Sequence, residues 1–541
     1  MEYLHLFKTK TEHDSFYNGN KYKEPWLAYI RDNTLVTGNK SYEYYRNEYL
    51  TLSALEDGEI TITIPSQVDS TYATSLSYSK DKSNWTPTTI DDTDQTITIQ
   101  VSSGEDVYLK GKAKQWFGLD GEVGMNITVS ANFNVSGNIM SLLYNDDFKD
   151  KTTFPDESVF TFAFLFAGNI YLKNAENLIL PATTLVPYCY GAMFVGCSSL
   201  TAAPELPATT LAEYCYGAMF EGCTSLTTAP ELPATTLADG CYYNMFSGCT
   251  SLTAAPALPA TTLANQCYYQ MFYNCTSLTT APELPATTLA MNCYYGMFQG
   301  CTSLTAAPEL PATTLADECY YQMFSGCTAL KTAPALLATT LASQCCYGMF
   351  EGCTSLATVP ELPATTLEER CYYNMFYGCT SLTTAPELPA TTLASQCCYD
   401  MFYGCSSLTT SPTVLPATTL ASECYSNMFY GCSSLTTAPE LPATTLAAYC
   451  YRGMFSGCTS LTAAPELPAT TLAERCYHQM FYGCSKLNSI TMLATNISAL
   501  YCLYQWVSKV ASTGTFTKAA SMTTLPTGTS GIPSGWTVKN K

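Results

Sequence analysis

The stretch CYYGMFQGCTSLTAAPELPATTLA occupies residues 293–316, and close copies of it precede and follow it along the chain. Every step between the first cysteines of successive copies is 26 residues, except one step of 27, where residues 411–420 read SPTVLPATTL. The first cysteines stand at 189, 215, 241, 267, 293, 319, 345, 371, 397, 424, 450, 476 and 502. A fixed period of this size is typical of a solenoid, in which each repeat packs only on its neighbours.

Each copy divides into two parts with different local preferences. The part LTTAPELP is short, rich in threonine and bounded by prolines, which favours one brief strand and a tight bend. In TTLADGCYYNMF (235–246), a threonine can cap a helix, and Leu237, Cys241 and Met245 follow at roughly helical spacing. The glycine of the next SGC would end that helix. The sequence therefore predicts one strand and one short helix per copy, which is the leucine-rich-repeat pattern.

The consensus LPATTLxxxCYxxMFxGCTSLT resembles the BspA-type leucine-rich repeat of surface proteins from gut Bacteroidetes, their phages and prophages, over residues 160–541. The opening TKTEHDSFYNGNKYKEPWLAYI (9–30) resembles the start of fibre-like structural proteins of Bacteroides phages, crAss-like phages among them. BspA-like adhesins normally carry an export signal, whereas this N-terminus has no basic segment leading into an apolar one. The two resemblances together imply a virion protein, with a bacterial BspA-like cell-surface adhesin as the alternative.

An α+β fold in five parts is expected. An all-β anchor or docking segment covers residues 1–45, and a small β-sandwich covers 46–150, where apolar and polar residues alternate. An imperfect copy at 151–188 is expected to cap the solenoid, with Asn169 at the position of the second cysteine. The leucine-rich-repeat solenoid of about 12 repeats covers 189–501. Residues 502–541 form the expected C-terminal cap, with Trp506 in place of the repeated methionine.

All 27 cysteines lie between residues 189 and 502. Zinc binding is disfavoured because the two cysteines of a copy are eight positions apart and the chain has only three histidines, His5, His13 and His478. Disulfides between equivalent cysteines of stacked coils would leave the Cβ atoms too far apart. We therefore predict two internal columns of reduced thiols that pack as small apolar side chains, without a cofactor or a bound metal.

Two columns of residues are candidates for contact with a partner or an ion. The position after each Met-Phe pair varies between copies, which is typical of a binding surface on a rigid frame and equally of a merely soluble face. Its tyrosines are Tyr273, Tyr377, Tyr403, Tyr430 and Tyr482. The other column repeats glutamate, and weak Ca²⁺ binding is a hypothesis for it because stacked carboxylates repel one another without a cation between them. Its members are Glu205, Glu231, Glu283, Glu309, Glu361, Glu387, Glu440 and Glu466.

Composition limits the possible functions. The net charge of −20 disfavours nucleic acid and anionic membranes as partners, and no run of 18 apolar residues is present to span a bilayer. No nucleophile–base pair, carboxylate pocket or phosphate loop is recognisable, so the chain is not expected to be an enzyme.

We expect a homo-oligomeric structural protein of a phage particle, a fibre or decoration on the surface of head or tail. Its N-terminal region would contact other virion proteins, and its solenoid arm would bind a glycan or protein of the host cell surface. The alternative location is the bacterial cell surface.

Overall fold

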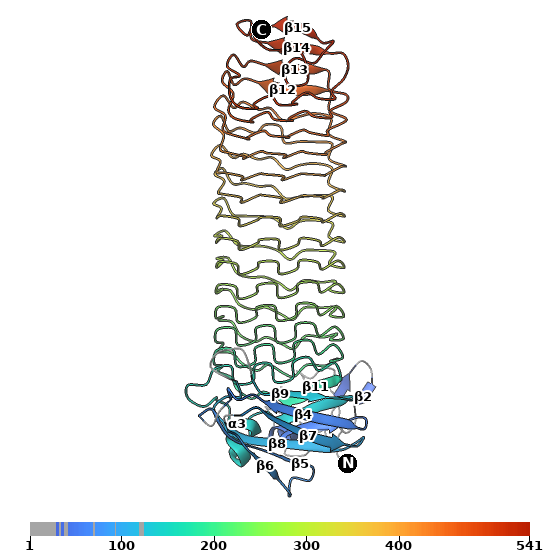
Figure 1. Cartoon of the computed structure of the whole chain (residues 1–541), viewed down its shortest axis with the longest axis vertical. Helices are drawn as coiled ribbons and strands as arrows, with labels where there is room; N and C mark the ends of the chain where they lie inside the picture. The colour runs from blue at the N-terminus through green and yellow to red at the C-terminus, as the bar shows by residue number, and fades with distance from the viewer. Residues whose placement is uncertain (1–28, 32–33, 37–41, 69–70, 92, 118–123) are drawn as a thin grey trace, which may run out of the picture.

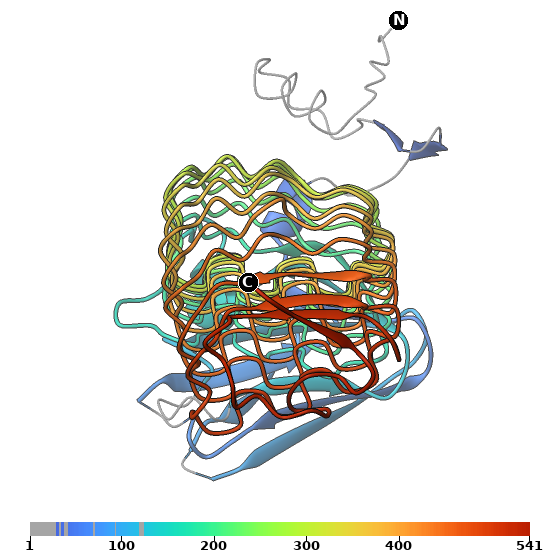
Figure 2. The same cartoon turned by 90° about the horizontal axis from the view of Figure 1, so that it is seen from above.

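The structure is a computed structural model that describes residues 29–31, 34–36, 42–68, 71–91, 93–117 and 124–541. Figure 1 shows a long rod of stacked coils, with a group of sheets at its N-terminal end and strands β12 to β15 at its C-terminal end. Seen from above, the coils overlie one another (Figure 2). The helical part of the expected α+β class is wrong, because the described residues are almost entirely strands, bridges and turns.

Two main sheets make up the N-terminal part. One has the strand order β11-β10-β3-β8-β5-β6 and the other β7-β4-β9. The strands are β3 Leu50–Ala54, β4 Gly58–Ile64, β5 Ala73–Ser79, β6 Thr86–Thr89, β7 Gln95–Val101, β8 Asp106–Ala113, β9 Asn126–Val129, β10 Phe133–Asn138 and β11 Leu172–Ile179. Both sheets bury residues such as Leu52 and Ile62 in one core. β11 pairs in parallel with β10, so this sheet crosses the expected boundary at residue 150 and leads into the rod.

The expected anchor, residues 1–45, lies mostly outside the described residues. Its described part is the antiparallel pair β1 Tyr29–Arg31 and β2 Thr34–Val36, followed by the start of helix α2 Tyr42–Arg46. The all-β expectation is wrong for α2, whose last turn carries Arg46 at the negative end of the helix dipole. Two further short helices, α3 Ser141–Tyr144 and η1 Asn145–Asp147, follow β10. None of the described helices is long and apolar enough to cross a membrane.

A series of turns replaces the helix predicted in each copy. In one coil Gln266, Gln270 and Asn274 have left-handed backbone angles, with φ of 54°, 47° and 55°. A left-handed residue at every fourth position is incompatible with an α-helix. The backbone N–H groups alternate between a carbonyl three residues back and a carbonyl of the next coil. The N–H of Met271 donates to Tyr268 at 3.3 Å, and the N–H of Phe272 donates to Met297 at 2.9 Å.

The predicted strand of each copy is reduced to isolated parallel bridges in most coils, such as Ala254 with Thr280. The prolines of the APELP motif lack the N–H group that a continuous ladder requires. Regular pairing returns at the C-terminal end, where β12 still carries the motif and pairs with an irregular register, whereas the strands after it lack the motif. The parallel strands there are β12 Ala463–Leu467, β13 Ser489–Met492, β14 Thr515–Lys518 and β15 Thr537–Asn540.

Repeated columns of buried side chains fill the rod. Both cysteines, the Met-Phe pair and the leucine of TSL are buried in successive coils. Phenylalanine rings stack from Phe166 to Phe481 with 5.4–5.7 Å between neighbouring centroids. Each cysteine is a buried free thiol, which confirms the predicted thiol columns. The second thiol of a coil donates to a backbone carbonyl, as from Cys301 Sγ to Phe272 O at 3.1 Å.

Atypical side chains cover both ends of these columns. Asn169 takes the position of the second cysteine in the first coil, where its amide donates to the carbonyl of Ile127 and its Oδ1 accepts the N–H of Val129, both in β9. In the last coil, Trp506 Nε1 donates to the carbonyl of Gly531 at 2.9 Å. These contacts fit the two expected caps, whose boundaries remain predictions.

The glycine before the second cysteine provides a test of the turn geometry. Gly326 has φ of 73°, and a Cβ atom there would lie 3.6 Å from the nitrogen of Gly300 in the preceding coil. We expect Gly326→Val to lower the free energy of unfolding by about 2 kcal/mol, because a β-branched residue is strained at this angle. Gly326→Asn is the control, since Asn274 has the same backbone conformation in its own coil. Urea unfolding measures the stability of both variants. Equal losses of stability would contradict backbone strain as the cause.

Candidate functional site

The turn segments form one continuous outward surface of the rod. We call the outward side chains of residues 265–274, and of the equivalent residues in the other coils, the turn face. Its polar positions vary from coil to coil, whereas the intervening Cys, Tyr, Met and Phe columns point inward and are buried. The turn face is therefore the surface on which packing does not dictate the side chain.

The five tyrosines predicted as partner contacts lie half-buried on the turn face. The structure brings three of them together, because Tyr403 stacks on Tyr377 at 4.7 Å and on Tyr430 at 4.6 Å between ring centroids. Tyr273 and Tyr482 lie in other coils of the same column, and the ammonium group of Lys509 lies 4.8 Å from the ring centroid of Tyr482.

A longer tyrosine ladder, which sequence reasoning missed, occupies the position two residues after the first cysteine. Its rings stack over seven successive coils with 4.4–4.7 Å between centroids. Its members are Tyr243, Tyr269, Tyr295, Tyr321, Tyr347, Tyr373 and Tyr399. The second tyrosine of the CYY motif is the sequence signal for this ladder. Stacking covers the ring faces, so the ladder presents ring edges and hydroxyl groups to a partner.

The ladder is neutral at physiological pH. Burial, and after it the charge of the neighbouring Tyr321, raise the pKa of Tyr295 to about 12. Burial also raises the pKa of Tyr321 to about 12. At the end of the ladder, burial raises the pKa of Asp400 to about 6, although a hydrogen bond from Asn427 and the charge of Arg452 act in the opposite direction. The ladder therefore presents uncharged hydroxyl groups and aromatic edges along its length.

The repeated glutamates lie outside the turn face and are exposed. Both the backbone N–H and the hydroxyl of Thr413 donate to the carboxylate of Glu387, and Glu466 forms an ion pair with Lys541. The part of the chain that the structure describes contains no group of three or more His, Cys, Asp or Glu side chains that could hold a metal ion. Weak Ca²⁺ binding to this column therefore stays a hypothesis.

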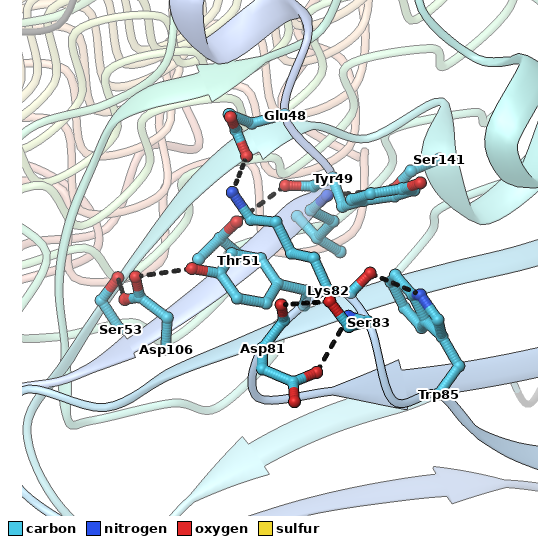
Figure 3. A network of polar contacts seen from close by, with 12 residues as sticks. Glu48, Tyr49, Thr51, Ser53, Asp81, Lys82, Ser83, Trp85, Asp106 and Ser141 are labelled. Atoms are coloured by element: carbon cyan, nitrogen blue, oxygen red, sulfur yellow. Dashed lines mark hydrogen bonds and ion pairs between the residues drawn. The ribbon is translucent and has the colours of Figure 1, made fainter.

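A polar network on the six-stranded sheet holds the segment that connects the N-terminal residues to the core (Figure 3). Tyr49 donates to Asp146 Oδ1 at 2.6 Å, and burial together with that carboxylate raises the pKa of Tyr49 to about 12. Lys110 donates to the same carboxylate at 2.9 Å and lies 4.1 Å from the ring centroid of Trp85. Lys82 pairs with Glu48. These groups satisfy one another, so the network fixes this segment and is not an open binding site.

Comparison with known proteins identifies the family of the repeats. A family model described as BspA type leucine rich repeat region (6 copies) matches residues 170–305, 218–357, 339–438 and 369–505, together more than half of the chain. A crystal structure of a leucine-rich repeat protein from Bacteroides ovatus ATCC 8483 is similar at 19% identity, covering 73% of this chain and 91% of that one, with a TM-score of 0.42. No curated protein matches the sequence.

Proposed function

Because the chain belongs to the BspA-type leucine-rich-repeat proteins, we propose that it is a surface-binding arm that contacts a cell-surface glycan or protein through the turn face of its rod. A repeat family of structural or adhesin type supports binding rather than catalysis. The N-terminal region would hold the arm, and the opposite end of the rod would project away from it (Figure 1).

The observation that carries this proposal is the composition and rigidity of the turn face. Each coil fixes its turn segment by hydrogen bonds to the next coil, as from the N–H of Gln270 to the carbonyl of Tyr295 at 2.7 Å. Stacked tyrosines with amide neighbours then form a preorganised surface. Such side chains lose little conformational entropy on binding, and tyrosine contributes much of the energy of many interfaces.

Two carriers of the arm are proposed. The first is a phage particle, with the arm as a homo-oligomeric head or tail fibre or decoration that contacts other virion proteins through residues 1–45. The resemblance of residues 9–30, which lie mostly outside the described part, supports it. The second is the bacterial cell surface, which the repeat family supports. Mass spectrometry of purified particles from a Bacteroides host separates them, because a virion component would be present at stoichiometric abundance.

The turn face can be tested with substitutions that the repeats themselves contain. We expect Tyr295→Ser, Tyr321→Ser and Tyr347→Ser together to weaken binding of the full chain to Bacteroides cells at least about tenfold, because interface tyrosines often contribute more than 1 kcal/mol each. Serine occurs naturally in this column at Ser426. Flow cytometry of the labelled protein measures the effect.

The matched control changes the glutamate column instead. Glu283→Ala and Glu309→Ala reproduce the alanines found there at Ala257 and Ala335, and they should leave binding unchanged. Equal binding by wild type and the tyrosine variant, with both folded by circular dichroism, would contradict the turn face as the binding surface.

A further inference from the structure

The rod reverses its charge near the C-terminal end. Between residues 189 and 449 the sequence has 17 acidic residues and only two basic ones, Lys331 and Arg370. From residue 450 to the end it has seven basic residues and two acidic ones. The positive segment lies at the end of the rod opposite the N-terminal sheets (Figure 1). An arm that is acidic along its shaft is therefore basic where it ends.

Both acidic residues of this segment already contact a cation. Glu474 pairs with Arg475 at 3.0 Å, and Glu466 pairs with Lys541. The excess positive charge of the segment thus remains after its internal ion pairs are formed. A local excess of one sign attracts ligands of the other sign, even on a protein of opposite net charge.

Aromatic rings flank Arg475 and Lys509 on the turn face. The guanidinium carbon of Arg475 lies 5.2 Å from the ring centroid of Tyr449 in one neighbouring coil and 5.1 Å from that of Tyr501 in the other. His478 stacks on Tyr504 at 5.1 Å between centroids. We call Tyr449, Arg475, His478, Tyr501, Tyr504 and Lys509 the tip patch.

The tip patch is unusually open for an aromatic cluster. Tyr501 is 51% exposed, Tyr504 is 42% exposed, and the adjoining Leu500 is 57% exposed. Large aromatic side chains are exposed together at few other places on the rod, and exposed apolar clusters with a polar rim mark interaction sites. Tyrosine and arginine are also the residues most enriched at binding hot spots.

We infer that the tip patch binds an anionic polysaccharide, one that bears carboxylate or sulfate groups on its sugar rings. Nη1 of Arg475 donates to Glu474 and to the hydroxyl of Tyr449, and the remaining N–H groups of its planar guanidinium can donate two parallel hydrogen bonds to a carboxylate or sulfate. The exposed rings of Tyr501 and Tyr504 provide flat apolar surfaces for the C–H faces of sugar rings. The inference rests on the proposed function, since it names a ligand class for the end of the same turn face.

Other anionic partners fit the charges less well. The acidic shaft would repel a nucleic acid lying along the rod. Recognition of anionic lipids typically uses a cluster of four to eight lysines and arginines, whereas the tip patch has two such cations. Binding of the tip patch to the acidic shaft of a second copy is disfavoured, because it would bring two negatively charged shafts close together.

Immobilised polygalacturonate and dextran sulfate, with neutral dextran as the reference, test the inference on the full chain. The wild type should bind one or both anionic polymers at low ionic strength, release them at high salt, and ignore dextran. The variant carrying Arg475→Gln and Lys509→Asn should bind about 10 to 100 times more weakly, which corresponds to a total loss of about 1.4–2.8 kcal/mol, the size of one hydrogen bond to a charged group.

The control is Arg370→Gln, which removes an arginine from the same column in the acidic shaft and should bind like the wild type. Glutamine is native to that column at Gln266, Gln344 and Gln396, so both arginine substitutions are compatible with its left-handed backbone. Equal polymer binding by the tip variant and the wild type would overturn the inference. So would binding to anionic lipid vesicles or to a second copy without binding to either polymer.

The two proposals can fail separately. If the tip variant loses polymer binding and yet no cell binding is found for the wild type, the ligand class stands and the cell-surface function is wrong. If the wild type binds cells and neither anionic polymer, the function stands and the anionic ligand is wrong.

Discussion

Raising the pH from about 8 to about 11 is expected to unfold the rod. The cause is the buried thiols. Burial raises the pKa of each of nine cysteines to about 12. Burial also raises the pKa of many other core cysteines, such as Cys293, and of core tyrosines, such as Tyr294.

The folded state loses stability as the pH rises, because folded and unfolded thiols lose their protons at different pH values. An unfolded thiol has a pKa of about 8.5, so the unfolded chain loses its protons at a pH where the folded chain still keeps them. The stabilisation is complete below that value and is lost as the pH rises towards about 12. Between these two pKa values, each thiol lowers the free energy of unfolding by about 1.4 kcal/mol per pH unit. The nine together lower it by about 12 kcal/mol per unit. This is comparable to the whole stability of a typical domain.

Circular dichroism during a pH titration, combined with thiol labelling, measures this transition. Labelling should be slow at pH 8 and should reach all 27 cysteines through the transition. Repeating the titration at high salt is the control for the net charge of −20, since salt screens surface repulsion and leaves the burial of thiols unchanged. Intact structure at pH 11 would contradict the prediction, and thiols that label readily in that intact structure would show that the columns are not sealed from solvent.

The limits of the sequence prediction have a physical origin in the turn segments. Leu237, Cys241 and Met245 are four residues apart, and over three positions a period of four cannot be told from the 3.6 of a helix. The informative residues were Gly240, Asn244 and Gly248, which tolerate left-handed angles and stand at the same interval.

Even so, single-copy preferences could not have established the turn geometry. Tyr214 and Tyr449 adopt left-handed angles of 47° and 58°, which tyrosine rarely does. The N–H of Tyr214 donates to the carbonyl of Asp239 in the next coil at 3.0 Å, so the neighbouring coil imposes the conformation. The period and the buried columns were predictable because they depend only on side-chain repetition.

Some surface features could likewise be predicted from the sequence, and others could not. The column of Tyr273 and Tyr403 could be found from its variation, whereas the stacking of the ladder depends on the distance between coils. The network around Tyr49 and Asp146 joins residues 97 positions apart, and no local pattern announces such a contact. The charge reversal after residue 450 was present in the sequence, but its meaning needed the rod, which places that segment at one end (Figure 1).

Replacing Phe298 by alanine is expected to lower the free energy of unfolding by about 3–5 kcal/mol, because it leaves a cavity in a closely packed column. Phe298 is fully buried, with the ring centroid of Phe272 at 5.7 Å on one side and that of Phe324 at 5.6 Å on the other. Gln299→Ala changes the adjacent residue on the turn face and should have little effect.

The position of the substitution should matter as much as its size. In a solenoid each coil contacts only its neighbours, so Phe298→Ala separates two long halves of the rod, which then unfold in distinct steps. Phe481→Ala makes the same cavity next to the C-terminal cap, where the ring centroids of Phe481 and Trp506 are 6.1 Å apart. Most of the rod then remains continuous. Urea unfolding should therefore broaden or split for Phe298→Ala and remain closer to a single transition for Phe481→Ala. A single transition with an unchanged midpoint for Phe298→Ala would mean that the coils are not coupled through the phenylalanine column.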